Sequence, residues 1–193
     1  MIITISGTPG SGKSTIARIL AERLKAERIY VGGIRRELAR KKGMTLEELN
    51  VYAQTHPETD VDVDTKAAEQ AKALDKKGKI VIVEGRTQFY FLPSSLKMYI
   101  SVSPEEGARR IWKDLQLATT KEARNEGKIT SLAQLKKSLV EREENDAQRY
   151  QKYYGFDHRG RHNYDYVVNT TAITAKQAAE KILKIVKQKT LNK

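Results

Sequence analysis

The sequence predicts an α/β fold in which a five-stranded parallel sheet is flanked by helices, and two observations lead to this prediction. Short apolar runs alternate with segments of helical periodicity, as expected when each strand is followed by a helix that crosses back over the sheet. The runs are nearly continuous in Val, Ile and Tyr, which is typical of strands covered on both faces. The expected strands are residues 2–6, 29–31, 79–84, 97–102 and 164–169.

The helical patterns fall between these strands and after the last of them. No repeat and no low-complexity linker divides the 193 residues, so we expect one domain over residues 1–193. The polar stretch 118–130 interrupts the alternation without a change of composition and is interpreted as an insertion in that domain. The expected helices are residues 14–25, 33–42, 46–52, 64–75, 104–117, 132–154 and 175–187.

Composition limits the class of protein. The chain is 39% hydrophobic and 31% charged, and no run approaches the roughly 20 apolar residues that span a bilayer. It has no cysteine, which excludes disulfides and thiolate metal sites. The apolar start MIITIS follows no basic residues, so it predicts a strand rather than a signal peptide, and we expect a cytoplasmic protein without membrane partners.

The net charge of +12 is concentrated in two segments. Residues 109–142 hold nine Lys and Arg against four Asp and Glu, and residues 176–193 hold six Lys against one Glu. In the second segment the lysines alternate with apolar residues at helical spacing, which favours an amphipathic helix over 175–193 with a solvated basic face. Affinity for nucleic acid remains an alternative interpretation, although it is not favoured.

The most specific signal is the run GTPGSGKS at residues 7–14, a complete G-x-x-x-x-G-K-S phosphate-binding loop. Its glycines let the backbone approach phosphates closely, and the following helix presents its positive end to them. A β-branched strand precedes the run and an amphipathic helix follows it, which is the context that this loop requires. The motif predicts ATP and Mg²⁺ as cofactors, with Lys13 at the β and γ oxygens and Ser14 on the metal. The expected nucleotide-binding residues are Gly7, Thr8, Pro9, Gly10, Ser11, Gly12, Lys13, Ser14 and Thr15.

Other motifs narrow the class of P-loop protein. The sequence has no N-K-x-D motif for guanine and no LSGGQ-like transporter signature, and it is too short for a motor or helicase core. What remains is a small-molecule kinase, which needs several positive groups around the transferred phosphoryl group. Candidate arginines occur after successive strands and on one helix face, where residues 142, 146 and 149 are spaced i, i+4 and i+7. Glu84 ends the third strand, where it can hold Mg²⁺ through water. The remaining candidates are Arg36, Arg86, Arg142, Asp146 and Arg149.

These residues occur in an order that resembles the cytidylate kinases of the nucleoside-monophosphate kinase superfamily, particularly the short archaeal type. The resemblance covers most of the chain and rests on ISGTPGSGKSTIA, IYVGGIRRELARKKGMTLEELN, HPETDVDVD, VIVEGR, REENDAQRYQKYYGFD and YDYVVNTT. It implies a monophosphate-binding segment over 31–75, a lid region over 113–141, and phosphoryl transfer from ATP to CMP or dCMP by a monomeric enzyme. The resemblance implies catalytic roles for Lys13, Arg142 and Arg149. It implies acceptor-binding roles for Arg36, Asp60, Asp64, Arg86, Asp146 and Arg149.

Two departures from the family's pattern affect the acceptor side. The usual G-D-I-F-R is Gly32-Gly33-Ile34-Arg35-Arg36 here, and the lid region is longer. Two alternatives therefore stay open: another acceptor, such as a different nucleotide, a nucleic-acid 5′ end or a small metabolite, and a non-enzymatic module that binds nucleic acid in response to ATP. For Asp60 and Asp64, a solvated acidic helix start is as good an interpretation as contact with ribose or base.

Overall fold

The centre of the molecule is a five-stranded parallel sheet with strand order β2-β3-β1-β4-β5. The computed structural model describes residues 1–117 and 129–191. β1 lies in the middle and pairs with β3 through Ile5 and Glu84 and with β4 through Gly7 and Ile100. The strands are β1 Ile2–Gly7, β2 Glu27–Tyr30, β3 Val81–Glu84, β4 Leu96–Ser101 and β5 Tyr166–Asn169.

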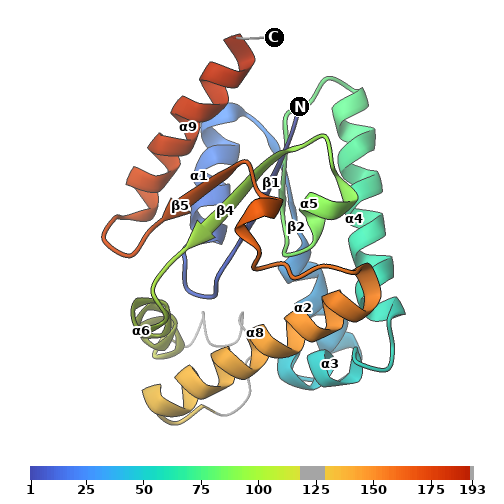
Figure 1. The fold of residues 1–193 in the computed structure, drawn as a ribbon, viewed down its shortest axis with the longest axis vertical. Helices are drawn as coiled ribbons and strands as arrows, with labels where there is room; N and C mark the ends of the chain where they lie inside the picture. The colour runs from blue at the N-terminus through green and yellow to red at the C-terminus, as the bar shows by residue number, and fades with distance from the viewer. Residues whose placement is uncertain (118–128, 192–193) are drawn as a thin grey trace.

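Helices cover both faces of the sheet and extend beyond its carboxyl edge. Figure 1 shows α1 and α9 on one face, α4 and the short α5 on the other, and α2, α3, α6 and α8 beyond the carboxyl ends of the strands. The helices are α1 Lys13–Leu24, α2 Val31–Lys41, α3 Leu46–Tyr52, α4 Glu58–Lys76, α5 Gln88–Phe91, α6 Pro104–Leu115, α8 Leu132–Tyr154 and α9 Ala175–Leu191, with a 3₁₀ turn η1 at Arg161–Asn163.

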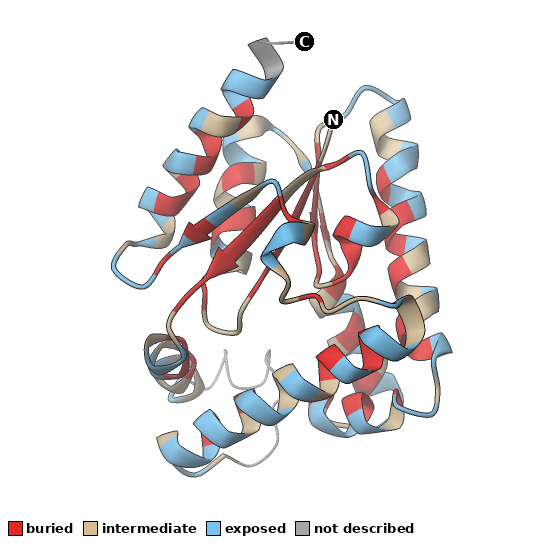
Figure 2. Ribbon diagram, viewed as in Figure 1, coloured by how far each residue is buried: buried red, intermediate tan, exposed pale blue. Residues whose placement is uncertain are grey.

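The three central strands β1, β3 and β4 are largely buried on both faces, as their continuous apolar character predicts, whereas the edge strands β2 and β5 are partly exposed (Figure 2). Ile3 and Ile5 belong to the cluster that joins the sheet to α1 and α9. Val81 and Val83 belong to a second cluster on the opposite face, against α4. Since successive side chains of a strand point to opposite faces, the two clusters hold the sheet between two helical layers.

The predicted α/β fold is confirmed, with local differences. Val31, predicted as the end of a strand, begins α2. The helix predicted over 64–75 begins six residues earlier as α4, directly after Pro57, whose fixed φ suits a helix start. The interpretation of Asp60 and Asp64 as a solvated helix start is therefore wrong, because they are only 1% and 4% exposed. The short helices α5 and η1 were not predicted.

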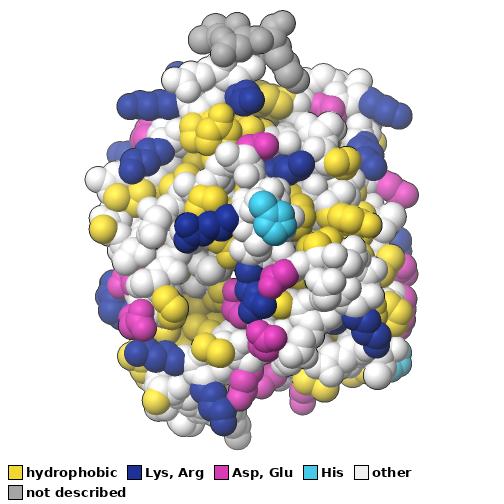
Figure 3. Space-filling view, viewed as in Figure 1, with side chains coloured by type: hydrophobic (Ala, Val, Ile, Leu, Met, Phe, Trp, Pro, Cys, Tyr) yellow, Lys and Arg dark blue, Asp and Glu magenta, His cyan; other side chains and the backbone are white. Residues whose placement is uncertain are grey.

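The basic segment near the end of the chain forms the predicted amphipathic helix. In α9 the apolar side chains Ala178, Ile182 and Val186 are buried against the sheet. On the face in Figure 3, Lys and Arg side chains are scattered among Asp and Glu rather than gathered in one patch. In the described part of the chain, no helix is both long enough and apolar enough to cross a membrane. Residues 118–128 of the predicted lid region lie outside the described residues.

Candidate active site

The phosphate-binding loop connects the end of β1 to the start of α1, and its backbone excludes side chains at two positions. Gly7 has φ 151°, and a Cβ atom there would lie 2.0 Å from the carbonyl oxygen of Ile100. Gly10 has φ 74°, and its Cβ would lie 2.3 Å from the carbonyl oxygen of Gly107 in α6. Glycine is required at both positions because the loop is pressed against β4 and α6.

Hydrogen bonds from neighbouring strands fix this loop. The Thr8 amide donates to the Ile100 carbonyl at 3.1 Å, and the Val102 amide donates to the Thr8 hydroxyl at 3.1 Å. Beyond β5, the Thr170 hydroxyl donates to the Ser11 carbonyl at 2.9 Å. Arg110 of α6 in turn donates to the Thr170 carbonyl at 2.7 Å. The loop is thus held in place by groups other than a ligand, so little ordering has to accompany phosphate binding.

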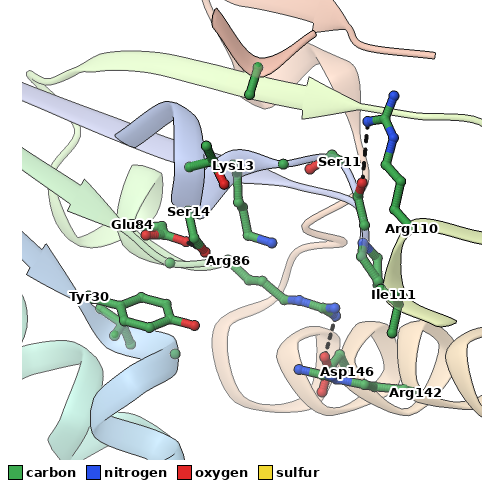
Figure 4. A pocket seen from close by; sticks show the side chains of 18 of the residues that line it. Ser11, Lys13, Ser14, Tyr30, Glu84, Arg86, Arg110, Ile111, Arg142 and Asp146 are labelled. Atoms are coloured by element: carbon green, nitrogen blue, oxygen red, sulfur yellow. Dashed lines mark hydrogen bonds and ion pairs between the residues drawn. The ribbon is translucent and has the colours of Figure 1, made fainter. Parts of the chain in front are cut away.

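A cavity of about 890 Å³ opens from this loop toward α2 and α8. Figure 4 shows Lys13 and Arg86 extending into it, with Asp146 and Arg142 contributed by α8. Four of the predicted site residues do not line this cavity: Gly7, Thr8, Asp60 and Arg149. The predicted site residues that do line it are Pro9, Gly10, Ser11, Gly12, Lys13, Ser14, Thr15, Arg36, Asp64, Glu84, Arg86, Arg142 and Asp146.

Lys13 provides the positively charged side chain of the phosphate-binding loop itself. Burial, opposed by the negative charge of Glu84 and assisted by the positive charges of Arg86 and Arg142, lowers the pKa of its ammonium group to about 8. Desolvation disfavours the charged form, and an anion placed beside the amine would favour it again. A phosphate group bound in the loop would therefore raise the pKa of Lys13 again and keep its ammonium group charged.

Ser14 and Glu84 form the part of the site that could hold a metal ion. The Ser14 hydroxyl donates a hydrogen bond to Oε1 of Glu84, whose side chain is only 1% exposed. The other carboxylate oxygen accepts from Nη2 of Arg28 at 2.6 Å. The described residues contain no cluster of three or more His, Cys, Asp or Glu side chains suited to a metal. One hydroxyl and one carboxylate beside a phosphate loop fit Mg²⁺, which takes oxygen ligands and retains water and substrate phosphates in its coordination shell.

Arg86 is fixed between β3 and α8 by two carboxylates. Its guanidinium pairs with Glu143 at 2.6 Å and with Asp146, and its side chain is 11% exposed. Burial alone would lower the pKa of Arg86, but the two carboxylates outweigh it and raise the pKa. The same contact, joined by Arg149, holds the pKa of Asp146 well below its usual range despite burial. Arg86 therefore stays charged in the lining of the cavity, in an orientation set by α8.

Arg149 lies behind the cavity rather than in it. Its side chain, 1% exposed, pairs with Asp60 of α4 and with Asp146 of its own helix, the latter at 2.5 Å. Asp60 also pairs with Arg35 of α2. Arg149 is thus part of a buried ionic network that joins α8 to the segment over residues 31–75.

Asp64 lies one turn after Asp60 on α4 and does line the cavity. It accepts hydrogen bonds from Gln88 at 3.1 Å and from the Tyr154 hydroxyl at 3.0 Å. Burial raises the pKa of this carboxyl group even though the hydrogen bonds work in the opposite direction. The Asp64 carboxyl group is therefore held in a fixed orientation in the wall of the cavity by Gln88 and Tyr154.

Several lining residues were missed at the level of sequence. Their positions follow from the parallel topology, because the segments after β2, β4 and β5 all meet at the carboxyl edge of the sheet. The missed lining residues include Tyr30, Arg35, Asn50, Arg110, Asp114, Tyr150 and the residues from Thr171 to Ala175.

The fold and the phosphate loop with its surrounding arginines define a P-loop kinase. Residues 3–150 match a family model described as an AAA domain, and the chain belongs to that family. Two solved structures share the fold at low sequence identity. An uncharacterized protein from Eubacterium ventriosum is 17% identical with a TM-score of 0.63, and the match covers 97% of this chain and 98% of that one. Shikimate kinase from Acinetobacter baumannii is 19% identical with a TM-score of 0.58, and the match covers 97% of this chain and 93% of that one.

Two relatives are much more similar in sequence. The cytidylate kinase of Archaeoglobus fulgidus is 39% identical over 190 residues, which cover 98% of this chain and 96% of that protein. The cytidylate kinase of Pyrobaculum arsenaticum is 36% identical over 179 residues, covering 92% and 88%. The chain belongs to the cytidylate kinase family and is a nucleoside-monophosphate kinase.

Proposed function

We propose that the protein transfers the γ-phosphoryl group of ATP to CMP or dCMP. The observation that carries this proposal is that one cavity is lined both by the phosphate loop with Lys13 and by two further arginines, Arg36 and Arg86. A phosphate-free acceptor would leave these two arginines without an anionic partner from the substrate. A nucleoside monophosphate supplies a phosphate for them and a base for the polar groups beyond.

The proposed chemistry is a direct in-line transfer. An oxygen of the acceptor phosphate attacks the γ-phosphorus of ATP, the bond from that phosphorus to the β–γ bridging oxygen breaks, and ADP leaves. The acceptor phosphate is ionised at neutral pH, so no protein group has to remove a proton. Lys13 and Arg142 stabilise the charge on the transferred group, while Arg36 and Arg86 hold the attacking phosphate in line.

Mg²⁺, held by Ser14 and by Glu84 through water, would neutralise charge on the ATP phosphates when bound. The position of Glu84 supports this, since its carboxylate already accepts the Ser14 hydroxyl. We assign Asp64 and Asp146 to the sugar or base of the acceptor, and their place in the lining of the same cavity supports this. Arg149, which is itself paired with Asp60, fixes the orientation of Asp146 from behind the cavity.

The proposal is tested with Mg·ATP and CMP, dCMP, UMP, AMP or GMP in separate reactions, each followed by the appearance of ADP. We expect the highest kcat/KM with CMP or dCMP. Turnover limited to a purine monophosphate, or none with any of the five, would refute the proposed acceptor.

A further inference from the structure

Tyr30 is a cavity-lining residue to which neither the family pattern nor the mechanism above gives a role. It ends β2 and immediately precedes α2. Its ring packs over the first turn of that helix: a Cβ atom on Gly33 would lie 2.6 Å from Cδ1 of the ring, and one on Gly32 would lie 3.0 Å from Cε2. The ring thus fills the space that a side chain at either position would need, which gives a physical reason for the Gly32-Gly33 pair.

The ring also contacts a charged residue. The guanidinium of Arg28 lies over it, 4.9 Å from the ring centroid, and the same guanidinium pairs with Glu84 at 2.6 Å. Arg28 and Tyr30 share one face of β2, and Tyr30 is paired in register with Glu84 of β3. Arg28 therefore positions the ring of Tyr30, and Arg28 is itself held by Glu84, the residue proposed to face the metal.

The hydroxyl of Tyr30 lies on the acceptor side. It accepts a hydrogen bond from Nη1 of Arg36 at 2.8 Å, and Arg36 also donates to the Gly32 carbonyl at 3.0 Å. Figure 4 shows the Tyr30 hydroxyl directed into the cavity. Because the oxygen acts as acceptor toward Arg36, its own proton is available for another acceptor, and a phosphate oxygen bound by Arg36 would lie within reach.

We propose that Tyr30 is a further acceptor-binding residue, whose hydroxyl donates a hydrogen bond to the same phosphate that Arg36 binds. Arg28 and the glycines at 32 and 33 hold its ring in place. This inference rests on the proposed function, since it assigns a ligand to the phosphate of that acceptor. It also accounts for the loss of an acidic residue at Gly33: a side chain there would displace the ring.

The test is the substitution Tyr30→Phe, which removes only the hydroxyl and keeps the ring. Hydrogen bonds to charged groups are strong enough that the Kd for CMP, measured by calorimetry, should rise about tenfold or more. The Kd for ATP should stay within about twofold, because the phosphate loop is untouched. Tyr90→Phe is the matched control: Tyr90 is 50% exposed on α5, and its variant should bind CMP as the wild type does.

A double-mutant cycle separates direct contact from an effect on Arg36. If Tyr30 contacts the phosphate, Tyr30→Phe still weakens binding severalfold in an Arg36→Met background. If Tyr30→Phe has no further effect on CMP binding in the Arg36→Met background, Tyr30 acts only by orienting Arg36, and the inference is overturned. Gly33→Ala should weaken CMP binding as well, although it removes no polar group, because the ring must move.

A second probe keeps this inference distinct from the proposed function. Binding of inorganic phosphate in the presence of saturating ADP, followed by ³¹P NMR, needs no base recognition. Wild-type protein that binds phosphate but not CMP would refute the proposed acceptor, and a weaker phosphate affinity in Tyr30→Phe would still support the role of the hydroxyl. An unchanged phosphate affinity and an unchanged CMP affinity in that variant would overturn it.

Discussion

Replacing Arg149 with alanine tests whether the ionic network behind the cavity stabilises the fold. The substitution removes a guanidinium whose side chain is 1% exposed and which pairs with two carboxylates, those of Asp60 and Asp146. Breaking a buried ion pair from one side costs about 3–5 kcal/mol, because the remaining charge stays buried without its partner. Asp60 keeps its pair with Arg35 and Asp146 keeps Arg86, so we expect the lower end, about 3 kcal/mol.

The measurement is urea unfolding at pH 7, followed by circular dichroism and by the fluorescence of Trp112 of α6, which packs against the apolar cluster that α6 shares with α8. In a thermal melt of a chain of this length, the expected loss of about 3 kcal/mol in unfolding free energy corresponds to a decrease in Tm of roughly 6–12 °C. Arg159→Ala is the matched control: Arg159 pairs with Asp157 and Glu144 but is 38% exposed. Removing an exposed pair should cost no more than about 1 kcal/mol. A loss for Arg149→Ala as small as that of the control would refute the account of a stabilising buried network.

Three further predictions concern the phosphate loop and its metal. Lys13→Ala should lower kcat by about a hundredfold to a thousandfold and leave the urea unfolding curve unchanged within error; normal turnover would contradict the role of the loop. Since the pKa of the Lys13 ammonium is lowered to about 8, and bound phosphates favour its charged form, the Kd for ATP should rise above pH 8, by up to about tenfold per pH unit. The same titration with Lys13→Met should lack this rise, and a flat profile for the wild type would refute the lowered pKa. Glu84→Gln should raise the Mg²⁺ concentration needed for half-maximal ATP binding severalfold, measured with a fluorescent ATP analogue; an unchanged requirement would exclude Glu84 from the metal site.

The strands and the phosphate loop were predictable because their signals are local. The continuous apolar runs reflect burial on both faces, and the loop needs glycine wherever β4 or α6 approaches within contact distance of its backbone. The α8 face that carries Arg142, Asp146 and Arg149 was predicted from spacing alone, and the structure confirms that helix over Leu132–Tyr154.

What spacing could not show is which neighbours cover that face. Arg149 meets Asp60 of α4 across 89 positions of sequence, so its burial depends on how α4 and α8 pack. Asp60 itself lies in the first turn of α4, which begins at Glu58, earlier than its apolar periodicity predicts. Tyr30 was missed for a related reason: its partners, Arg28, Gly33 and Arg36, are close in sequence but meet only where β2 turns into α2.

The most direct test of the central claim compares CMP with cytidine as acceptors for Mg·ATP, with the products followed by ³¹P NMR. The claim is that the cavity binds two phosphate groups, one at Lys13 and one at Arg36 and Arg86. The account predicts formation of CDP and ADP from CMP and no phosphorylation of cytidine. Equal phosphorylation of cytidine, or failure to form CDP, would contradict it.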